Sequence, residues 1–284
     1  MSLCAVAVVS FNTRDLLRSL LQTVRSESPV EVVVVDNGST DGTAGMVREE
    51  FPEVRLLVDP ENPGYGAAAN RAIAATSAPY VLLLNGDTRL MPGALAALAD
   101  HLDRHPRTGL AGPRLVNAEG RPQPSCFPFL GTFRLALEKS PLGRWLARVP
   151  ALRERWLLLH GPHDRPRTVP WVLGSALAIR REAFEAVGGF DPGFFLYAEE
   201  VDLCYRLWQA GWEVGFTPAA TVVHVGGAST APLRGTMEVR RVESARRFYR
   251  RHYSPARVAV LEAAIRTARA ARRVRDRLRE AFHG

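Results

Sequence analysis

The stretch VLLLNGDTRL at residues 81–90 decides the fold. Four apolar residues run directly into Asn85, Gly86 and Asp87, where the apolar character stops. A strand that is apolar on both faces is typical of a parallel sheet covered by helices on both sides. Asn-Gly-Asp is also ordinary turn chemistry, so these residues alone leave both a plain turn and a ligand site open.

Apolar strands and helix-like segments alternate along the chain around this stretch. We expect strands at residues 3–10, 30–36, 54–59 and 80–87, and helices at 14–24, 43–51, 67–76 and 92–102. This alternation predicts an α/β fold with a mostly parallel sheet and helices on both faces. A less regular region from about 115 to 168 is expected to be a mobile loop or a lid. Helices at 181–187 and 198–210 and a last strand or hairpin at 213–225 follow.

Composition limits the class of protein. With 284 residues, 46% hydrophobic and 23% charged, the chain can bury a sizeable globular core. It contains no run of eighteen apolar residues that would predict a membrane span, and its start lacks the basic segment and cleavage site of a signal peptide. Three widely spaced cysteines argue against a disulfide framework or a zinc site and favour a cytoplasmic location.

Three polar segments follow strands that should point the same way: SFN at 10–12, DNG at 36–38 and NGD at 85–87. In such sheets ligands bind beyond the carboxyl ends of the strands, so we expect the three segments to share one site. Asp36 is suited to accept the imide N–H of uracil or thymine. An Asx-rich turn with a helix cap at Ser39 or Asp41 is the alternative.

The segment ENPGYGAAANRA at 61–72 places Gly64 and Gly66 before a helix that carries Asn70 and Arg71. Backbone N–H groups at such a helix start, together with an arginine, can approach a diphosphate. The segment is neither a G-x-G-x-x-G after the first strand nor a Walker loop, which disfavours a dehydrogenase and a P-loop NTPase.

The segment FFLYAEEVDLCYRLWQAG at 194–211 places Glu199, Glu200 and Asp202 at the start of a predicted helix. Acidic residues are favoured there by the helix dipole, but three within four positions exceed what capping needs. One of them is a candidate general base, since clustering and partial burial raise a carboxylate pKa. Arg206 follows Asp202 by four residues, a spacing at which the two side chains can pair on a helix. His224, at the end of the last apolar segment, is either a structural residue or a metal ligand.

Seven motifs in order resemble an inverting family 2 glycosyltransferase with the GT-A fold, in particular the bacterial rhamnosyltransferase-like branch that builds surface polysaccharides. They are VSFN, DNGSTDGT, NPGYGAAANRA, LLLNGDT, WVLGSALAIRREAFEAVGGFD, FFLYAEEVDLCYRL and HVGGAS, between about residues 4 and 230. The resemblance implies a Rossmann-like domain with a nucleotide-sugar-binding half at 1–115 and an acceptor-binding and catalytic half at 116–230. Residues 231–284 would form a basic helical extension.

The resemblance also implies a role for each matched position. The donor would be a UDP- or dTDP-sugar, with dTDP-rhamnose as a candidate. It would be bound by Ser10, Asn12, Asp36, Asn37, Gly64, Asn70, Arg71, Asn85, Gly86 and Asp87. Asp87 and His224 would hold Mn²⁺ or Mg²⁺. Glu200 would be the catalytic base, and the acceptor, a saccharide or lipid-linked saccharide, would be bound by Trp171, Gly174, Glu199 and Asp202.

Two positions depart from the family pattern. Asn85 stands where a DxD motif has its first aspartate, which leaves one carboxylate for the metal. Glu200 replaces the usual aspartate, and its extra methylene moves the carboxylate by roughly 1.5 Å. A non-catalytic nucleotide-sugar-binding or scaffold protein of a glycan assembly complex therefore stays open as an alternative. A nucleotidyltransferase is disfavoured, because SFNTRD rather than a Gly-rich basic loop follows the first strand.

The net charge of +8 is concentrated in the tail. Residues 234–284 contain 15 arginines and 5 acidic residues, a net charge of +10, which leaves −2 for residues 1–233. Apolar residues recur at helical spacing from Pro255 to Phe282, so we expect a basic amphipathic helix at the inner face of the plasma membrane. Packing on the catalytic domain or in a homodimer is an equal alternative, and no motif supports nucleic-acid binding.

Overall fold

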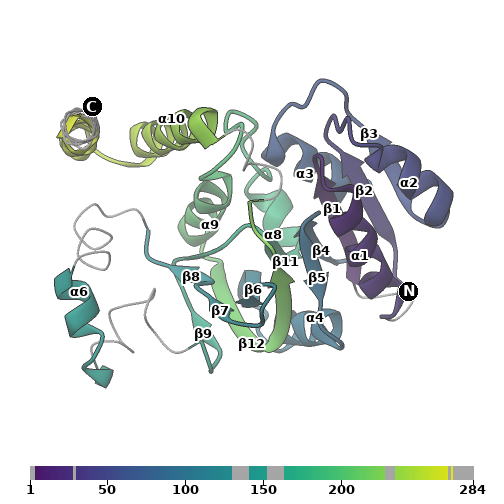
Figure 1. Ribbon diagram of the computed structural model, residues 1–284. Helices are drawn as coiled ribbons and strands as arrows, with labels where there is room; N and C mark the ends of the chain where they lie inside the picture. Colours follow the sequence, from purple (N-terminus) through teal and green to yellow (C-terminus); the bar gives the residue numbers. More distant parts are fainter. Residues whose placement is uncertain are drawn as a thin grey trace, which may run out of the picture.

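The computed structural model describes residues 4–27, 30–129, 141–151, 163–227, 234–267 and 270 (Figure 1). The elements up to residue 116 are β1 (Cys4–Ser10), α1 (Arg14–Arg25), β2 (Val32–Asp36), α2 (Thr43–Glu50), β3 (Arg55–Val58), α3 (Tyr65–Ala74), β4 (Tyr80–Asn85), β5 (Thr88–Leu90), α4 (Ala94–Arg104) and β6 (Thr108–Val116). They are followed by β7 (Pro122–Gln123), β8 (Cys126–Phe127), α6 (Pro141–Leu146), β9 (Arg167–Thr168), β10 (Trp171–Val172), β11 (Ala176–Arg180), α8 (Arg181–Ala186), α9 (Glu199–Gln209), β12 (Glu213–His224) and α10 (Arg234–His252).

The central sheet has the strand order β3-β2-β1-β4-β11-β6-β12-β5. The first four strands pair in parallel, β11 is antiparallel to both of its neighbours, and β6 and β12 are parallel to each other. Six of these eight strands therefore run in one direction, which confirms the mostly parallel sheet. The register pairs Ser10 with Asp36 and Val9 with Asn85, so the predicted polar strand ends do lie side by side.

Helices cover both faces of the sheet, as predicted. One core layer joins the sheet to α1, α2 and α4 through residues such as Leu20, Met46 and Leu98. The other joins it to α3, α8 and α9 through residues such as Ile73 and Leu203. Strands that are apolar on both faces are the sequence signature of this burial from two sides.

The strand β6 was not predicted. Its sequence TGLAGPRLV contains two glycines and a proline, which weaken the signal of a strand. The glycines are required by packing: a Cβ on Gly109 would lie 2.8 Å from the Cβ of Ala183, and one on Gly112 would lie 2.7 Å from the Cβ of Val172. The segment at 213–225 is one long strand, β12, and not a hairpin.

Of the region 115–168, in which a mobile loop or a lid is expected, residues 130–140 and 152–162 lie outside the described residues. The described parts of that region contain β7, β8, β9 and α6. None of the described helices combines the length and the apolar character that crossing a membrane would require.

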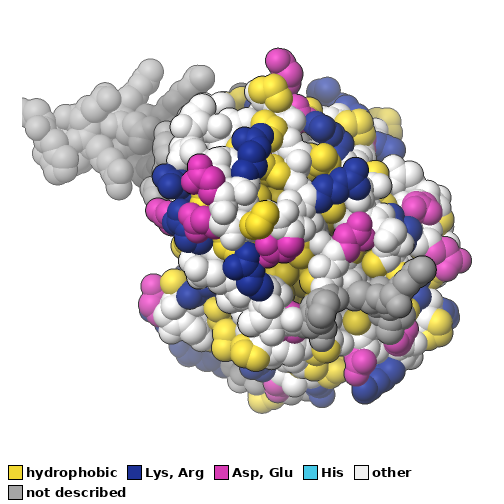
Figure 2. All heavy atoms as spheres, turned by 90° about the vertical axis from the view of Figure 1, so that its right-hand side faces the viewer, with side chains coloured by type: hydrophobic (Ala, Val, Ile, Leu, Met, Phe, Trp, Pro, Cys, Tyr) yellow, Lys and Arg dark blue, Asp and Glu magenta, His cyan; other side chains and the backbone are white. Residues whose placement is uncertain are grey.

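The C-terminal extension begins with α10, which packs against α9 (Figure 1). Phe248 and Tyr249 of α10 are buried together with Phe194 and Val201. A second helical stretch at 255–267 follows, and the rest of the helix predicted up to residue 282 is outside the described residues except for residue 270. On the face that carries α1 and α2, basic and acidic side chains are interspersed, so this face has no large patch of one sign (Figure 2).

Candidate active site

A cavity of about 510 Å³ opens at the carboxyl ends of β1, β4 and β12. This is the edge at which the sequence placed a ligand site. The predicted site residues that line the cavity are Asn37, Gly64, Asn85, Gly86, Asp87, Gly174, Glu199, Glu200 and His224. The fold therefore brings together residues from both halves of the chain.

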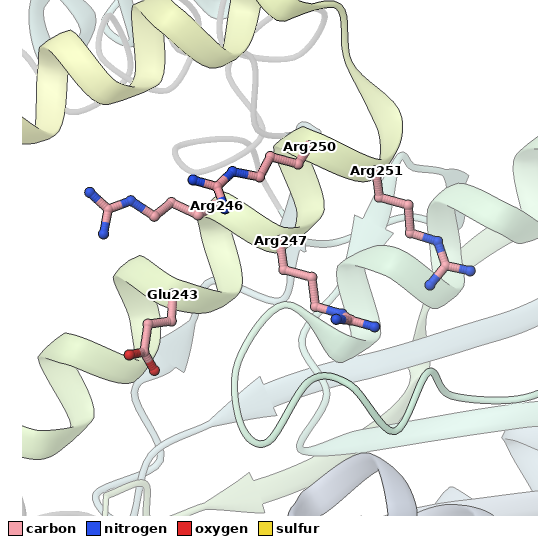
Figure 3. Close-up of a pocket in the computed structure, with 5 residues that line it drawn as sticks. All are labelled: Glu243, Arg246, Arg247, Arg250 and Arg251. Atoms are coloured by element: carbon pink, nitrogen blue, oxygen red, sulfur yellow. The ribbon is translucent and has the colours of Figure 1, made fainter.

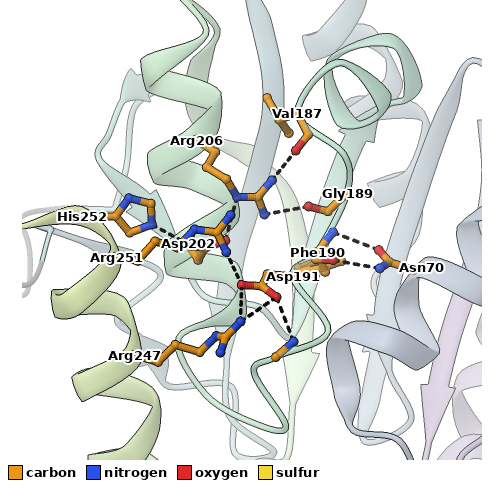
Figure 4. A network of polar contacts seen from close by, with 11 residues as sticks. Asn70, Val187, Gly189, Phe190, Asp191, Asp202, Arg206, Arg247, Arg251 and His252 are labelled. Carbon is orange, nitrogen blue, oxygen red and sulfur yellow. Dashed lines mark hydrogen bonds and ion pairs between the residues drawn. The ribbon is translucent and has the colours of Figure 1, made fainter.

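Four predicted donor-site residues do not line this cavity but support its walls. Asp36 is buried and accepts a hydrogen bond from the backbone N–H of Ser39 (3.2 Å). The Ser10 hydroxyl is bonded to that of Thr13 (2.8 Å), and Asn12 Oδ1 accepts from the backbone N–H of Thr40 (2.8 Å). The amide of Asn70 both donates to the carbonyl of Phe190 and accepts from its N–H, which fastens the turn after α8 to α3 (Figure 4).

Three other predicted residues, Arg71, Trp171 and Asp202, are not among the residues that line the cavity either. Arg71 is ion-paired with Asp59. Trp171 Nε1 donates to the carbonyl of Pro128 (2.6 Å). Asp202 is fully buried between Arg206 (2.7 Å) and His252 (2.7 Å), in the polar network that ties α10 to α9 (Figure 4). Residues two positions apart in an α-helix, such as Glu200 and Asp202, are separated by about 200° of rotation about the helix axis. Their side chains therefore point to nearly opposite sides of α9.

Asp87 and His224 are brought together by strand pairing. Residue 224 of β12 pairs with residue 88 of β5, and the His224 Nε2 lies 3.7 Å from Asp87 Oδ1. Burial lowers the pKa of His224, an effect that the Asp87 carboxylate opposes. A neutral imidazole beside a carboxylate is a pair that can bind a divalent cation.

Gln123 of β7 fixes the orientation of this imidazole. Its side-chain Nε2 donates to the His224 carbonyl (2.9 Å), so its Oε1 faces the His224 Nδ1 (3.1 Å). An amide oxygen only accepts, so Nδ1 carries the proton and Nε2 presents its lone pair toward Asp87. Fixing the tautomer through the other ring nitrogen is how proteins prepare histidine as a metal ligand.

The residues present fit a divalent cation. The Oδ1 of Asn85 is buried without a hydrogen-bond partner. Within the described ranges no group of three or more His, Cys, Asp or Glu side chains could hold a metal ion. A cation at Asp87 and His224 would therefore complete its coordination with oxygens of the substrate and of water.

The first turn of α9 supplies Glu199 and Glu200. The two residues before it, Tyr197 and Ala198, have φ values of 70° and 65°, a left-handed conformation that costs energy for non-glycine residues. This entry into the helix directs both carboxyl groups at the cavity. A Cβ on Gly174 would lie 3.4 Å from the Cβ of Glu200, so the glycine leaves room for that side chain.

The two carboxyl groups differ in their hydrogen bonds. Burial raises the pKa of Glu199 well above its usual range, and the adjacent Glu200 raises it further. Burial also raises the pKa of Glu200, but the backbone N–H groups of Val201 and Gly174 stabilise its charged form. Burial therefore favours the protonated form more strongly at Glu199 than at Glu200, and this asymmetry suits Glu200 to the role of base.

The structure adds cavity residues that the sequence did not indicate. Tyr65 donates to the carbonyl of Gly174 (3.0 Å), and burial raises the pKa of its hydroxyl, with a further contribution from the nearby carboxylates. Arg240 and Arg241 reach the cavity from α10. Nothing local distinguishes these two arginines from the others in a tail with 15 of them.

Residues 5–188 match the model of glycosyl transferase family 2. The chain belongs to this family. A second model, glycosyl transferase family group 2, matches residues 144–270. Membership of family 2 supports a glycosyl-transferring enzyme and agrees with the resemblance drawn from the seven motifs.

Relatives of this family 2 chain include an N-acetylglucosaminyl-diphospho-decaprenol L-rhamnosyltransferase of Mycobacterium tuberculosis. It is 39% identical over 219 residues, which are 72% of this chain and 69% of the relative. A pre-mycofactocin glycosyltransferase of the same organism is 30% identical over 75% of this chain and 40% of its own length.

Solved structures confirm the GT-A fold of this family 2 chain. A mannosyltransferase from Pyrobaculum calidifontis in complex with GDP-Man and Mn²⁺ superposes with a TM-score of 0.58 at 21% identity, over 92% of this chain and 68% of that one. GalNAc-T7 with UDP, GalNAc and Mn²⁺ gives 0.55 at 17% identity, over 78% and 43%. Both neighbours thus hold a nucleotide and Mn²⁺ on the same fold.

Proposed function

We propose that the protein transfers a sugar from a UDP- or dTDP-sugar, with dTDP-rhamnose the leading candidate, to a lipid-linked saccharide with inversion. The observation that carries the proposal is one cavity that joins the Asp87–His224 pair to the Glu199–Glu200 pair. The name of the mycobacterial relative supports the sugar and the lipid-linked acceptor. The reaction would belong to the synthesis of a cell-surface polysaccharide.

In this mechanism Glu200 is the general base. The acceptor hydroxyl attacks the anomeric carbon from the face opposite the leaving nucleotide diphosphate, and its proton passes to the Glu200 carboxylate. The bond from the anomeric carbon to the diphosphate oxygen breaks, and its electron pair leaves with that oxygen. Because the attack comes from the opposite face, the configuration of the anomeric carbon is inverted. Glu199 in its protonated form, which burial favours, would donate a hydrogen bond to the acceptor sugar. Glu200 replaces the aspartate of the family pattern, and the packing of its side chain on Gly174 would place the longer carboxylate.

The donor would occupy the side of the cavity next to β1, β2 and β4. Asn37, whose Oδ1 is buried without a partner, would contact the nucleotide, with Asp36, Ser10 and Asn12 holding the loops beneath it. A divalent cation held by Asp87 and His224 would neutralise charge on the diphosphate. The halves at 1–115 and 116–230 would then correspond to donor and acceptor binding.

The test is the substitution Glu200→Gln. It should lower the rate of transfer by about 10²- to 10⁴-fold, the usual contribution of general base catalysis, and leave nucleotide affinity unchanged. The control is Glu119→Gln, which alters an exposed carboxylate outside the cavity. Full activity of Glu200→Gln would remove Glu200 from the mechanism. Donor binding without turnover by the wild type, across UDP- and dTDP-sugars and lipid-linked acceptors, would favour the scaffold alternative.

We also propose that residues 255–284 hold the enzyme at an anionic membrane surface, where a lipid-linked acceptor would lie. Arginines at the described positions 257 and 266 support this assignment. Sedimentation with vesicles that contain anionic lipid tests it, because a chain truncated after residue 254 should then stay in the supernatant. Light scattering of the same samples would report whether the extension instead forms a homodimer.

A further inference from the structure

Two consecutive residues of α10, Arg240 and Arg241, line the cavity at its mouth. The Arg240 guanidinium lies 4.7 Å from the ring centroid of Phe195, and that of Arg241 lies 4.6 Å from the ring centroid of Tyr197. Stacking on an aromatic face holds a guanidinium in place without using its N–H donors. Both groups are therefore positioned at the cavity, and of their N–H donors only Nη1 of Arg240 is hydrogen-bonded to a described side chain, Glu243 (3.4 Å).

The positive charge of this pair is less fully balanced by neighbours than that of the arginines further along α10. Arg246 is paired with Glu262 (2.8 Å), and Arg247 with Asp191 (3.0 Å), on the part of the helix shown in Figure 3. In the described part of the chain Arg241 has no ion pair, and Arg240 has one exposed contact with Glu243 at 3.4 Å. Exposed pairs of this kind contribute little to stability, so the cavity keeps one unpaired cation, Arg241, and one that is only weakly paired, Arg240.

The surroundings of the two arginines favour an amphiphilic ligand. Phe195, Leu196 and Met237 form the adjoining wall, so cationic donors lie next to an apolar surface. The donor diphosphate is assigned to the Asp87–His224 side, where a metal would already neutralise it. A second pair of cations is then available for a second anionic substrate with an apolar part.

We propose that Arg240 and Arg241 bind the diphosphate of a lipid-linked acceptor, with the first units of its hydrocarbon chain against Phe195, Leu196 and Met237. This inference rests on the proposed function and assigns the acceptor class to a particular part of the same cavity. Each of the two guanidinium groups can make a pair of N–H···O hydrogen bonds to phosphate oxygens, whereas a lysine ammonium group acts as a compact point charge.

Farnesyl diphosphate, a short and soluble prenyl diphosphate, is the probe. We would titrate it into the full-length protein in EDTA by calorimetry, so that no metal contributes. The double variant Arg240→Gln/Arg241→Gln should bind it about 10- to 100-fold more weakly than the wild type, as expected for lost charge-assisted hydrogen bonds. Arg250→Gln is the matched control, because Arg250 is an exposed arginine of the same helix outside this cavity, and it should bind as the wild type does. Thermal unfolding of each variant, together with the two single substitutions, separates loss of the site from loss of the fold.

The same variants distinguish binding of the acceptor diphosphate from binding of the donor nucleotide diphosphate. Affinity for UDP and dTDP with Mn²⁺ should be unchanged, and the KM should rise for a diphospholipid acceptor but not for an uncharged alkyl glycoside. An equal loss of nucleotide affinity would assign the arginines to the donor and overturn the proposal. The proposal would also be overturned if the double variant bound farnesyl diphosphate as tightly as the wild type, or if the wild type did not bind it. Wild-type transfer to the alkyl glycoside tests the proposed function separately. Arginine-dependent farnesyl diphosphate binding without any transfer would sustain the site and reject the function.

Discussion

Replacing Glu199 by glutamine should change how the stability of the protein depends on pH. The Glu199 side chain is buried, its Oε2 has no hydrogen-bond partner, and Glu200 is adjacent. Burial and this neighbour raise its pKa well above the 4.5 expected in the unfolded chain. The native state therefore binds one more proton than the unfolded state throughout the interval between these two pKa values.

The sign and size of the effect follow from this difference in bound protons. The stabilisation by the neutral carboxyl group is complete below the unfolded-state pKa and is lost as the pH rises to the raised pKa. Within that interval the free energy of unfolding falls by about 1.4 kcal/mol per pH unit for one proton. Glutamine has nearly the same shape and does not titrate, so Glu199→Gln lacks this slope.

Urea unfolding at several values between about pH 5.5 and about pH 7.5 measures the difference between the variant and the wild type. Relative to the wild type, the variant should gain about 1.4 kcal/mol for each pH unit until the pH reaches the raised pKa of Glu199. Glu185→Gln, at an exposed carboxylate, should instead follow the wild type. If the difference in unfolding free energy between the variant and the wild type did not vary with pH, the reasoning would be refuted. Glu199 would then be ionised in the folded protein throughout this pH range.

Three further substitutions test the site and its support. Gly64→Ala should destabilise the protein by more than about 2 kcal/mol in urea unfolding, because φ is +99° and the new Cβ would lie 2.4 Å from a carbonyl oxygen. Gly45→Ala, in an open helical position, should be neutral or stabilising, and equal losses at both glycines would contradict this account. Gln123→Leu should weaken Mn²⁺ binding in the presence of UDP or dTDP by about 10- to 100-fold, measured by calorimetry; unchanged affinity would show that the histidine needs no such support. Asp202→Ala should cost about 3 to 5 kcal/mol by leaving the largely buried Arg206 without its carboxylate and His252 without its hydrogen-bond partner, and a loss below 1 kcal/mol would argue against a stabilising network.

The sequence by itself determined the layers of the fold and the edge at which the site lies. Alternation of apolar strands with amphipathic helices is a local property, so it predicted most elements to within two residues, including β1, β2, β4 and α9. The polar residues at the ends of the parallel strands had to share one edge, because strands that run the same way end on the same side. Asn85, Gly86 and Asp87, which this reasoning singled out, line one cavity with Glu200, which the motifs singled out.

Only the tertiary structure decided which of the candidate residues face one another. The register between β5 and β12 places His224 next to Asp87, and β7 brings Gln123 to that histidine, although these residues are far apart along the chain. Docking of α10 buries Asp202 and carries Arg240 to the cavity. Pairing of distant strands and docking of a helix depend on complementary surfaces formed by many residues, so no local pattern in the sequence could report them.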